Sequence, residues 1–299
     1  MSKQRKFFLI DLLLLLLILL PPVAGIVLRV LTHPASEGVS IAGALVYFPI
    51  PLPLGGLPIT ESQINSLLVL LSIFGLCLYL THGLKEKADT RRQHIAEWIV
   101  RKTEDLVKDN MGDYFAGFAP FIAAILALSA LSSLLSLFGL YPPTSDLNVV
   151  AGWAILVFIL ITYYKMKCGP RHYIKSFAEP VPLFAPMNLI SEVATPISMA
   201  FRHYGNVLSG SVISVLVAAG LQGLSSIVLG WLPGFLGEFP LFQIGIPAVL
   251  SLYFDIFSGC LQAFIFAMLT MMYVSGGFPA DDYARRQQAK REKKKQYIQ

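Results

Sequence analysis

Long apolar runs constrain this chain more than any other feature. Six segments contain few charged residues, and they cover residues 7–31, 62–83, 115–140, 150–166, 186–220 and 241–274. About 20 apolar residues suffice for a helix to cross a membrane. The chain is 55% hydrophobic and only 14% charged, whereas soluble domains are about one quarter charged. We therefore predict an all-α integral membrane protein with about six membrane helices, because the runs lack the alternation typical of a β-barrel.

Basic and non-basic connections alternate along the chain. Residues 84–112, residues 165–175 and the tail 281–299 are rich in Lys and Arg, whereas the 141–149 and 221–240 loops contain neither. Cytoplasmic loops carry such an excess of Lys and Arg. We therefore expect a multi-pass protein of a bacterial plasma membrane. Both of its termini are expected in the cytoplasm if the first helix is retained.

The first apolar segment allows two interpretations. The stretch "MSKQRKFFLIDLLLLLLILLPPVAG" has the basic start and apolar centre of a cleaved signal peptide. The apolar run continues through "VAGIVLRVL", however, and this length favours a retained membrane helix. We divide the chain into an extra N-terminal hydrophobic helix (1–40), a membrane domain (41–280) and a basic cytoplasmic tail (281–299).

One charged segment of the membrane domain is too polar to span. Residues 84–112 contain many Lys and Arg, yet Ile95, Trp98 and Ile99 form a partial apolar face. This pattern favours a helix on the cytoplasmic surface at about residues 88–110, with a plain solvated loop as the alternative.

The last two apolar segments are longer than a perpendicular crossing requires. The 35 residues of segment 186–220 would extend about 50 Å as a helix, whereas the hydrocarbon core is about 30 Å thick. Ordinary tilts of about 20° do not absorb this excess. Either the helices break, for example at Pro196 and Pro247, or they are strongly inclined. Two adjacent over-long segments favour a long, inclined hairpin.

Arg202 lies inside the fifth apolar segment. A guanidinium stays charged in proteins, and a charge at the membrane centre costs about 2.5–3.5 kcal/mol on insertion scales. With 100° per residue, the polar residues Ser191, Thr195, Ser198, Asn206 and Ser209 all lie within about 40° of Arg202. Small polar residues also serve helix packing, but packing does not explain the arginine.

The counter-charge of Arg202 is the next question. Between residues 186 and 275 the only acids are Glu192, Glu238 and Asp255. Asp255 could approach from the sixth segment, or another chain could supply a carboxylate. A structural arginine that is paired within the chain is the alternative. Intramembrane charges mark ion pathways by default, so we favour a functional role.

A second polar face is predicted on the sixth segment. Asp255, Gln262 and Tyr273 share one side of a regular helix there. On the fifth segment, Ser211 lies opposite Arg202. These positions suit one aqueous path on each side of the fifth helix.

Four stretches of sequence resemble subunit a of the F-type rotary ATP synthases. In "RHYGNVLSG", the residues Arg202, Gly205, Asn206 and Gly210 match the family pattern. The stretches "PMNLISEVATPIS", "PPTSDLNVVAGWAILVF" and "LQAFIFAMLTMMYVS" resemble three further parts of the family. Together they cover residues 60–280, and their combination is highly specific.

The chain departs from the family pattern at four positions. His203 and Tyr204 stand where Leu-Phe is usual, and Ser211 and Asp255 stand where the family commonly has Glu or His. His203 is interpreted either as a packing residue or as a pH-sensitive group. Without an ionisable group at position 211, Asp255 is expected to carry a proton relay alone, with water.

The resemblance implies an ion-translocating stator subunit beside a rotating ring of proteolipids, the c-ring. Arg202 would face the carboxylate of the ring, and Asn206 would orient water or Arg202. The outer half-channel residues would be Asp146, Asn148, Ser211, Asp255 and Gln262, and the cytoplasmic ones Asn188, Ser191, Glu192 and Thr195. Two of these have simpler interpretations, because Asn148 could cap a helix and Glu192 could lie at the lipid–water boundary.

Further partners implied by the resemblance are the peripheral-stalk b subunits, the rest of the complex and membrane lipid, but no nucleic acid. The coupling ion is expected to be a proton, although the ring largely decides between H⁺ and Na⁺. We expect no cofactor, because the sequence has no GxxxxGK[ST] phosphate loop and no metal-ligand cluster. Its three cysteines, Cys77, Cys168 and Cys260, are far apart. ATP chemistry would belong to partner subunits.

Two other classes of protein fit the sequence less well. A stand-alone secondary transporter often contains internal repeats, and none is found. An intramembrane hydrolase needs a nucleophile and base or an HExxH-like motif, and neither is present.

Overall fold

The structure is a computed structural model that describes residues 3–32, 43–51, 56–86, 90–177, 182–231, 242, 245–278 and 283. Six helical segments in this part are long and apolar enough to cross a membrane: Phe7–Thr32, Glu61–Thr81, Asp113–Phe138, Leu147–Lys165, Pro182–Leu229 and Ile246–Gly276. The predicted all-α membrane architecture is therefore confirmed. Glu238 and the tail, except for Tyr283, lie outside the described residues.

The α-helices, in chain order, are α1 (Lys3–Thr32), α2 (Glu61–Thr81), α3 (Arg91–Met111), α4 (Ala119–Leu134), α5 (Leu147–Lys165), α6 (Pro170–Phe177), α7 (Ala185–Leu229), α9 (Ile246–Ser251) and α10 (Gly259–Gly276). Short 3₁₀ turns connect them at η1 (Asp113–Phe118), η2 (Leu135–Phe138), η3 (Pro143–Ser145), η4 (Met166–Cys168) and η5 (Pro182–Phe184). Between α9 and α10 the segment η7 (Leu252–Ser258) is a π-helix.

Two short strands were not predicted. β1 (Val46–Ile50) and β2 (Leu57–Thr60) pair antiparallel, with Pro49 opposite Pro58. The aromatic and β-branched residues of β1 favour an extended chain, and proline is tolerated because each strand has a free edge. This hairpin leads directly into α2, where the backbone N–H of Glu61 donates to the carbonyl of Leu45 at 2.7 Å.

Capping residues explain where α2 and α3 begin. The Thr60 side chain and Gln63 form a capping box at the start of α2. The Thr90 hydroxyl accepts a hydrogen bond from the Gln93 backbone N–H at 3.3 Å. α3 therefore begins at Arg91, slightly later than the predicted 88, and it ends at Gly112, whose φ of 79° is typical of a glycine stop.

The predicted end of the fifth apolar segment at residue 220 is wrong. α7 continues without a break from Ala185 to Leu229, past both Pro196 and Gly220. An isolated glycine is tolerated inside a helix, and the residues after it are apolar enough to continue the helix. Pro247 does not break a helix either, because it lies in the first turn of α9, where proline is favoured.

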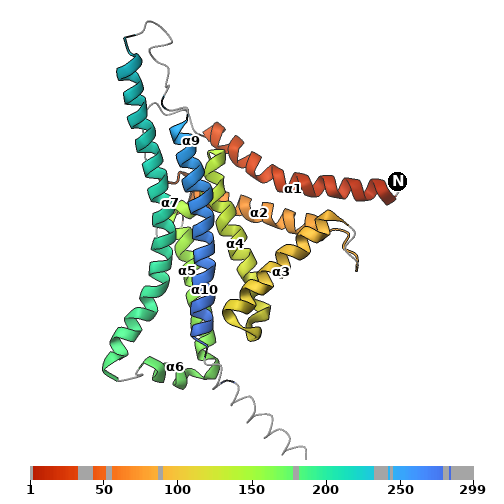
Figure 1. Ribbon diagram of the computed structural model, residues 1–299, viewed down its shortest axis with the longest axis vertical. Coiled ribbons are helices and arrows are strands. Elements are labelled where there is room, and N and C mark those ends of the chain that lie inside the picture. Colours follow the sequence, from red (N-terminus) through yellow and green to blue (C-terminus); the bar gives the residue numbers. More distant parts are fainter. Residues whose placement is uncertain are drawn as a thin grey trace, which may run out of the picture.

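The fifth and sixth segments form an antiparallel hairpin. Figure 1 shows α7 running the full length of the molecule, with α9 and α10 returning beside it and α1 and α2 lying across this direction. The 21 residues of α2 measure about 31 Å, close to the membrane core, whereas the 45 residues of α7 measure about 68 Å. If α2 crosses the membrane along its own length, α7 is too long to cross in the same way and must be strongly inclined.

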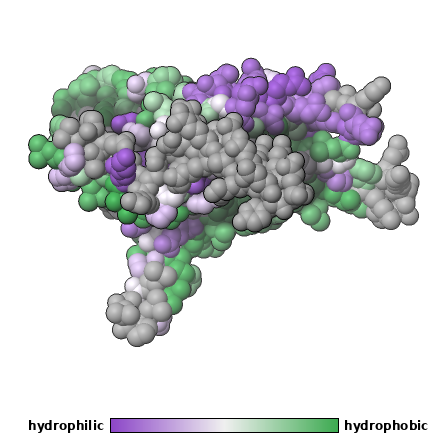
Figure 2. Space-filling view, turned by 90° about the horizontal axis from the view of Figure 1, so that it is seen from below, coloured by the Kyte–Doolittle hydropathy of each residue, from purple (hydrophilic) through white to green (hydrophobic). Residues whose placement is uncertain are grey.

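The core lies where α3, α4, α5 and α10 meet. Val107, Ile122, Val157 and Met271 are fully buried there. Many large apolar side chains are exposed, and the face seen in Figure 2 has broad hydrophobic areas beside a hydrophilic band and smaller hydrophilic patches. An exposed apolar surface of this extent is typical of a protein that contacts lipid or other membrane subunits.

Candidate functional site

Arg202 lies on the exposed side of α7. No carboxylate of the described residues lies within 4.0 Å of its guanidinium, and no hydrogen bond to it is formed within this part of the chain. The neighbouring positions on the same side are also exposed and small, namely Ser191, Ala194, Ser198 and Ser209. A permanent cation is therefore presented on a nearly flat, small-residue face that another membrane helix could approach closely.

Asn206 points away from this face. Its side-chain amide donates a hydrogen bond to the Ser258 hydroxyl of η7 at 2.8 Å. The amide thus joins the two halves of the hairpin, because an amide at the edge of a helix face can turn toward either neighbour. That Asn206 orients water or Arg202 stays a prediction.

A polar cavity of about 330 Å³ lies between the C-terminal half of α7, η7 and the α4–α5 connection; we call it the Asp255 cavity. Asp255 and Ser211 both line it, as predicted for residues of one path. The polar groups that the sequence did not nominate are Arg29, Ser136, Tyr141, Ser145, Ser214 and Ser251. Hydroxyls and a carboxylate around one cavity can hold water and transfer a proton.

The π-helical winding of η7 changes the predicted face of the sixth segment. Its turns are wider than those of an α-helix, so the rule of 100° per residue fails between Asp255 and Gln262. Gln262 is buried, and it does not line the Asp255 cavity. Tyr273 lies farther along α10 and lines a different cavity.

Asp146 and Asn148 lie at the start of α5. Asp146 is the N-cap, since its Oδ1 accepts from the Asn148 backbone N–H at 2.9 Å. The Ser62 hydroxyl donates to the other carboxylate oxygen of Asp146. Asn148 is exposed, and neither residue lines the Asp255 cavity. The capping role that was considered for Asn148 therefore belongs to Asp146.

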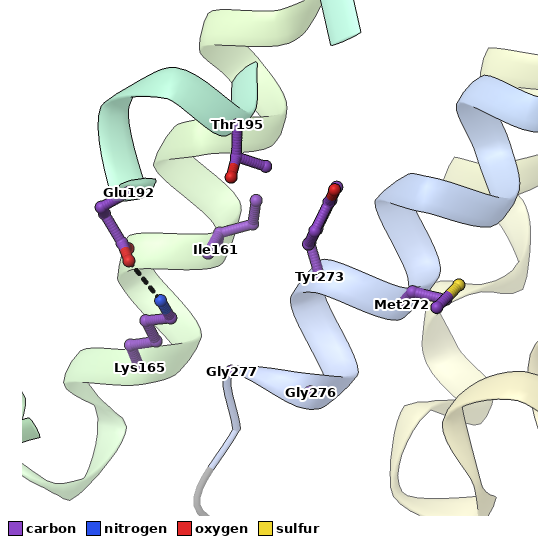
Figure 3. A pocket seen from close by; sticks show the side chains of 8 residues that line it. All are labelled: Ile161, Lys165, Glu192, Thr195, Met272, Tyr273, Gly276 and Gly277. Atoms are coloured by element: carbon purple, nitrogen blue, oxygen red, sulfur yellow. Dashed lines mark hydrogen bonds and ion pairs between the residues drawn. The ribbon is translucent and has the colours of Figure 1, made fainter. Parts of the chain in front are cut away.

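A second cavity, of about 210 Å³, lies near the N-terminal half of α7; we call it the Glu192 cavity. Figure 3 shows Glu192 and Thr195 of α7 facing Tyr273 of α10 across it, with Lys165 of α5 beside Glu192. The Lys165 ammonium donates to Glu192 Oε2 at 2.5 Å, whereas the buried Oε1 atom has no partner among the described residues. Lys165 was regarded only as a cytoplasmic charge, because the sequence does not show which acid it meets.

The other two predicted residues of this path lie elsewhere. The amide of Asn188 donates to the Phe177 carbonyl at 2.8 Å and connects α7 to the end of α6. Ser191 is exposed on the Arg202 face, and its carbonyl accepts from the Thr195 hydroxyl at 2.9 Å. Geometry therefore groups Glu192 and Thr195, and leaves Asn188 and Ser191 outside the Glu192 cavity.

A packed layer separates the two cavities. His203 is fully buried, and its ring meets those of Trp153 and Phe266 edge to face, with centroids 6.0 and 5.7 Å away. His203 Nε2 lies 3.2 Å from the Ser129 hydroxyl. This position agrees with the packing interpretation of His203. Arg202 lies between the cavities along α7, ten residues after Glu192 and nine before Ser211.

Comparisons with known proteins identify the family of this chain. The model of the ATP synthase A chain family matches residues 63–275. This range includes Arg202, the packed layer and the residues that line both cavities, except for Arg29, Gly276 and Gly277. The chain belongs to the ATP synthase A chain family. As a member, it is a multi-span component of the membrane sector of an ATP synthase, and ion translocation is the role of that sector.

Three curated relatives illustrate the range of similarity. The ATP synthase subunit a of Legionella pneumophila (strain Paris) is 29% identical over 242 residues, which are 80% of this chain and 95% of the relative. That of Bacillus pumilus (strain SAFR-032) is 30% identical over 74% of this chain and 93% of its own length. The sodium ion specific ATP synthase subunit a of Propionigenium modestum is 37% identical over 48% of this chain and 43% of its own length.

Proposed function

We propose that this A-chain family member is the static partner of a rotating proteolipid ring and conducts protons to and from it through two offset half-channels. The Asp255 cavity would be the outer half-channel, and the Glu192 cavity the cytoplasmic one. The observation that carries this proposal is the position of Arg202, which has no acid partner among the described residues and lies between two separate polar cavities.

Elementary electrostatics explains why an arginine suits this position. A ring carboxylate can face lipid only as the neutral acid, because a bare charge there is costly. Opposite Arg202 the carboxylate is favoured as the anion, since a nearby cation lowers its pKa. The ring site therefore loses its proton beside Arg202 and must regain one before it returns to lipid.

The packed layer determines the route of the proton. A proton that enters the Asp255 cavity is blocked by His203, Trp153 and Phe266 from reaching the Glu192 cavity within this chain. It must instead travel around on the ring to reach the second cavity. The peripheral-stalk b subunits would hold this chain against the torque, and ATP chemistry would take place in the soluble part of the complex.

Arg202→Lys is expected to abolish ATP-driven proton pumping while the complex still assembles. A lysine is a compact point charge that can neutralise when desolvated, whereas a guanidinium cannot. Pumping is measured in membrane vesicles by quenching of a pH-sensitive dye, and assembly by co-purification of the proteolipids in mild detergent. Arg101→Lys, on the exposed side of α3, is the matched control and should pump normally.

Normal pumping by the Arg202→Lys complex would refute the proposed mechanism. Purification of the wild-type chain without proteolipids and without a soluble ATPase would instead favour a stand-alone transporter.

A further inference from the structure

The N-terminal helix α1 is built into the membrane domain, although it lies outside the residues matched by the family description. Gly25 of α1 and Gly75 of α2 allow close approach, since a Cβ atom on either would lie 3.1 Å from a leucine side chain across the contact. The Ser72 hydroxyl of α2 donates to the Ile18 carbonyl of α1 at 3.1 Å. This contact is specific, rather than the loose apposition of two apolar helices.

Charged groups of α1 find partners near both ends of the helix. Asp11 Oδ1 lies 2.9 Å from Arg92 Nη1 and 2.9 Å from His82 Nδ1. Near the other end, Arg29 Nη1 lies 3.8 Å from Glu61 Oε1. Charges within an apolar helix are costly and usually functional. The contacts of Asp11 explain its charge, because they anchor α1 to α2 and α3. Arg29, in contrast, has further neighbours besides Glu61.

Arg29 also lines the Asp255 cavity. Its side chain is 37% exposed, while that of its partner Glu61 is only 4% exposed. Glu61 Oε1 additionally accepts the backbone N–H of Tyr141 at 3.4 Å, and Tyr141 lines the same cavity. The charged side chains that line this cavity are therefore Arg29 and Asp255, with the Glu61 carboxylate directly behind Arg29.

We propose that Arg29 and Glu61 form a charge-balanced pair that controls cation entry into the Asp255 cavity, so that α1 forms a functional part of the wall of the outer half-channel. This inference rests on the proposed function of the cavity. A guanidinium cannot be deprotonated, so an unbalanced Arg29 would repel every entering cation. With Glu61 beside it the pair is neutral, and Asp255 then provides the only net charge that the described residues place on the cavity wall.

Reciprocal variants test the balance of charge. Glu61→Gln leaves Arg29 unbalanced and should slow ATP synthesis, whereas the double variant Arg29→Gln/Glu61→Gln should restore it. Rates are measured in reconstituted vesicles containing the whole complex, driven by an imposed proton gradient. At low ionic strength we expect Glu61→Gln to lower the rate about tenfold or more, as for electrostatic control of access. At high salt the loss should shrink, because exposed charges are screened.

Two controls separate electrostatics from packing. Arg29→Lys keeps the charge and should lose far less of the synthesis rate than Glu61→Gln does, and every variant is checked for assembly by co-purification with the proteolipids. Equal and additive losses in the single variants Glu61→Gln and Arg29→Gln, or a loss that does not change with salt, would overturn the proposal. An N-terminal sequence of the purified subunit that begins after Arg29 would overturn it as well.

The two proposals fail in different ways. If Arg202→Lys complexes still pump protons, the proposed function itself is wrong. If Arg202→Lys blocks pumping while Glu61→Gln leaves synthesis unchanged at low salt, only the role of Arg29 and Glu61 is wrong.

Discussion

Adjacent residues of the family motif face opposite environments. Arg202 is exposed, and His203 is buried with its ring against Trp153 and Phe266. The turn of about 100° between successive helical residues produces this contrast. A charged residue and a packed aromatic layer can therefore be neighbours in sequence, and the side chain of His203 lies in that layer.

His203→Leu should preserve the packed layer. Leucine is the usual residue in the family, and a swap of similar volume typically costs less than about 1.5 kcal/mol. His203→Ala should instead open a gap between the two cavities and raise the passive proton leak. Leak is measured by the decay of an imposed pH gradient in vesicles without ATP. A leucine variant that assembles but has lost coupling would show that the imidazole acts chemically.

The ion pair of Lys165 and Glu192 should matter for stability as well as for conduction. The Lys165 and Glu192 side chains are only partly exposed, at 26% and 11%, and removal of one partner would leave the other charge unpaired in a partly buried site. Lys165→Met should therefore lower the thermal unfolding midpoint of the complex, and Lys165→Met/Glu192→Gln should recover much of the loss. A double variant no better than Lys165→Met would mean that the pair contributes through packing alone.

At the scale of elements, glycines decide how closely helices cross. A Cβ atom on Gly259 of α10 would lie 2.8 Å from Ser133 Cβ of α4, and one on Gly210 of α7 would lie 3.0 Å from the Phe254 ring of η7. The π-helix η7 contains Phe254 and ends directly before Gly259, and its Asp255 lines the Asp255 cavity. Irregular helical turns of this kind are frequent at functional sites.

Gly259→Ala should weaken the contact between α4 and α10. Overpacking of a well-packed contact typically costs about 1–3 kcal/mol, so we expect a lower unfolding midpoint. Gly152→Ala is the matched control, because a Cβ atom there on α5 meets nothing within 4 Å. A smaller effect at Gly259 than at Gly152 would contradict the close crossing. Thermal unfolding in detergent, followed by circular dichroism, measures both.

For the whole molecule, the notable property is the separation of two polar cavities along one continuous helix. The Glu192 cavity contacts the N-terminal half of α7, and the Asp255 cavity contacts its C-terminal half. Figure 1 shows that α7 lies at the side of the bundle rather than at its centre. A long, peripheral helix can thus face a partner along one side and two cavities along the other.

Asp255→Asn should slow proton transport more than Ser211→Ala does. Among the described residues Asp255 is the only carboxylate that lines its cavity, whereas the Ser211 hydroxyl already donates to the Val207 carbonyl at 3.0 Å and has other hydroxyls nearby. ATP synthesis at limiting outer proton concentration is the measurement. The reverse order of the two variants would mean that the outer path is assigned to the wrong residues.

The sequence by itself determined the membrane class, the six apolar segments, the over-long hairpin and the family. These properties depend on the hydrophobicity of continuous stretches and on local motifs, which a linear chain displays directly. Only the tertiary structure decided which polar residues share a cavity. Lys165 meets Glu192, Arg29 joins Asp255, and Gln262 leaves the predicted face. Contacts between distant segments and the wider winding of η7 produced these outcomes, and neither is encoded in the spacing of residues along one regular helix.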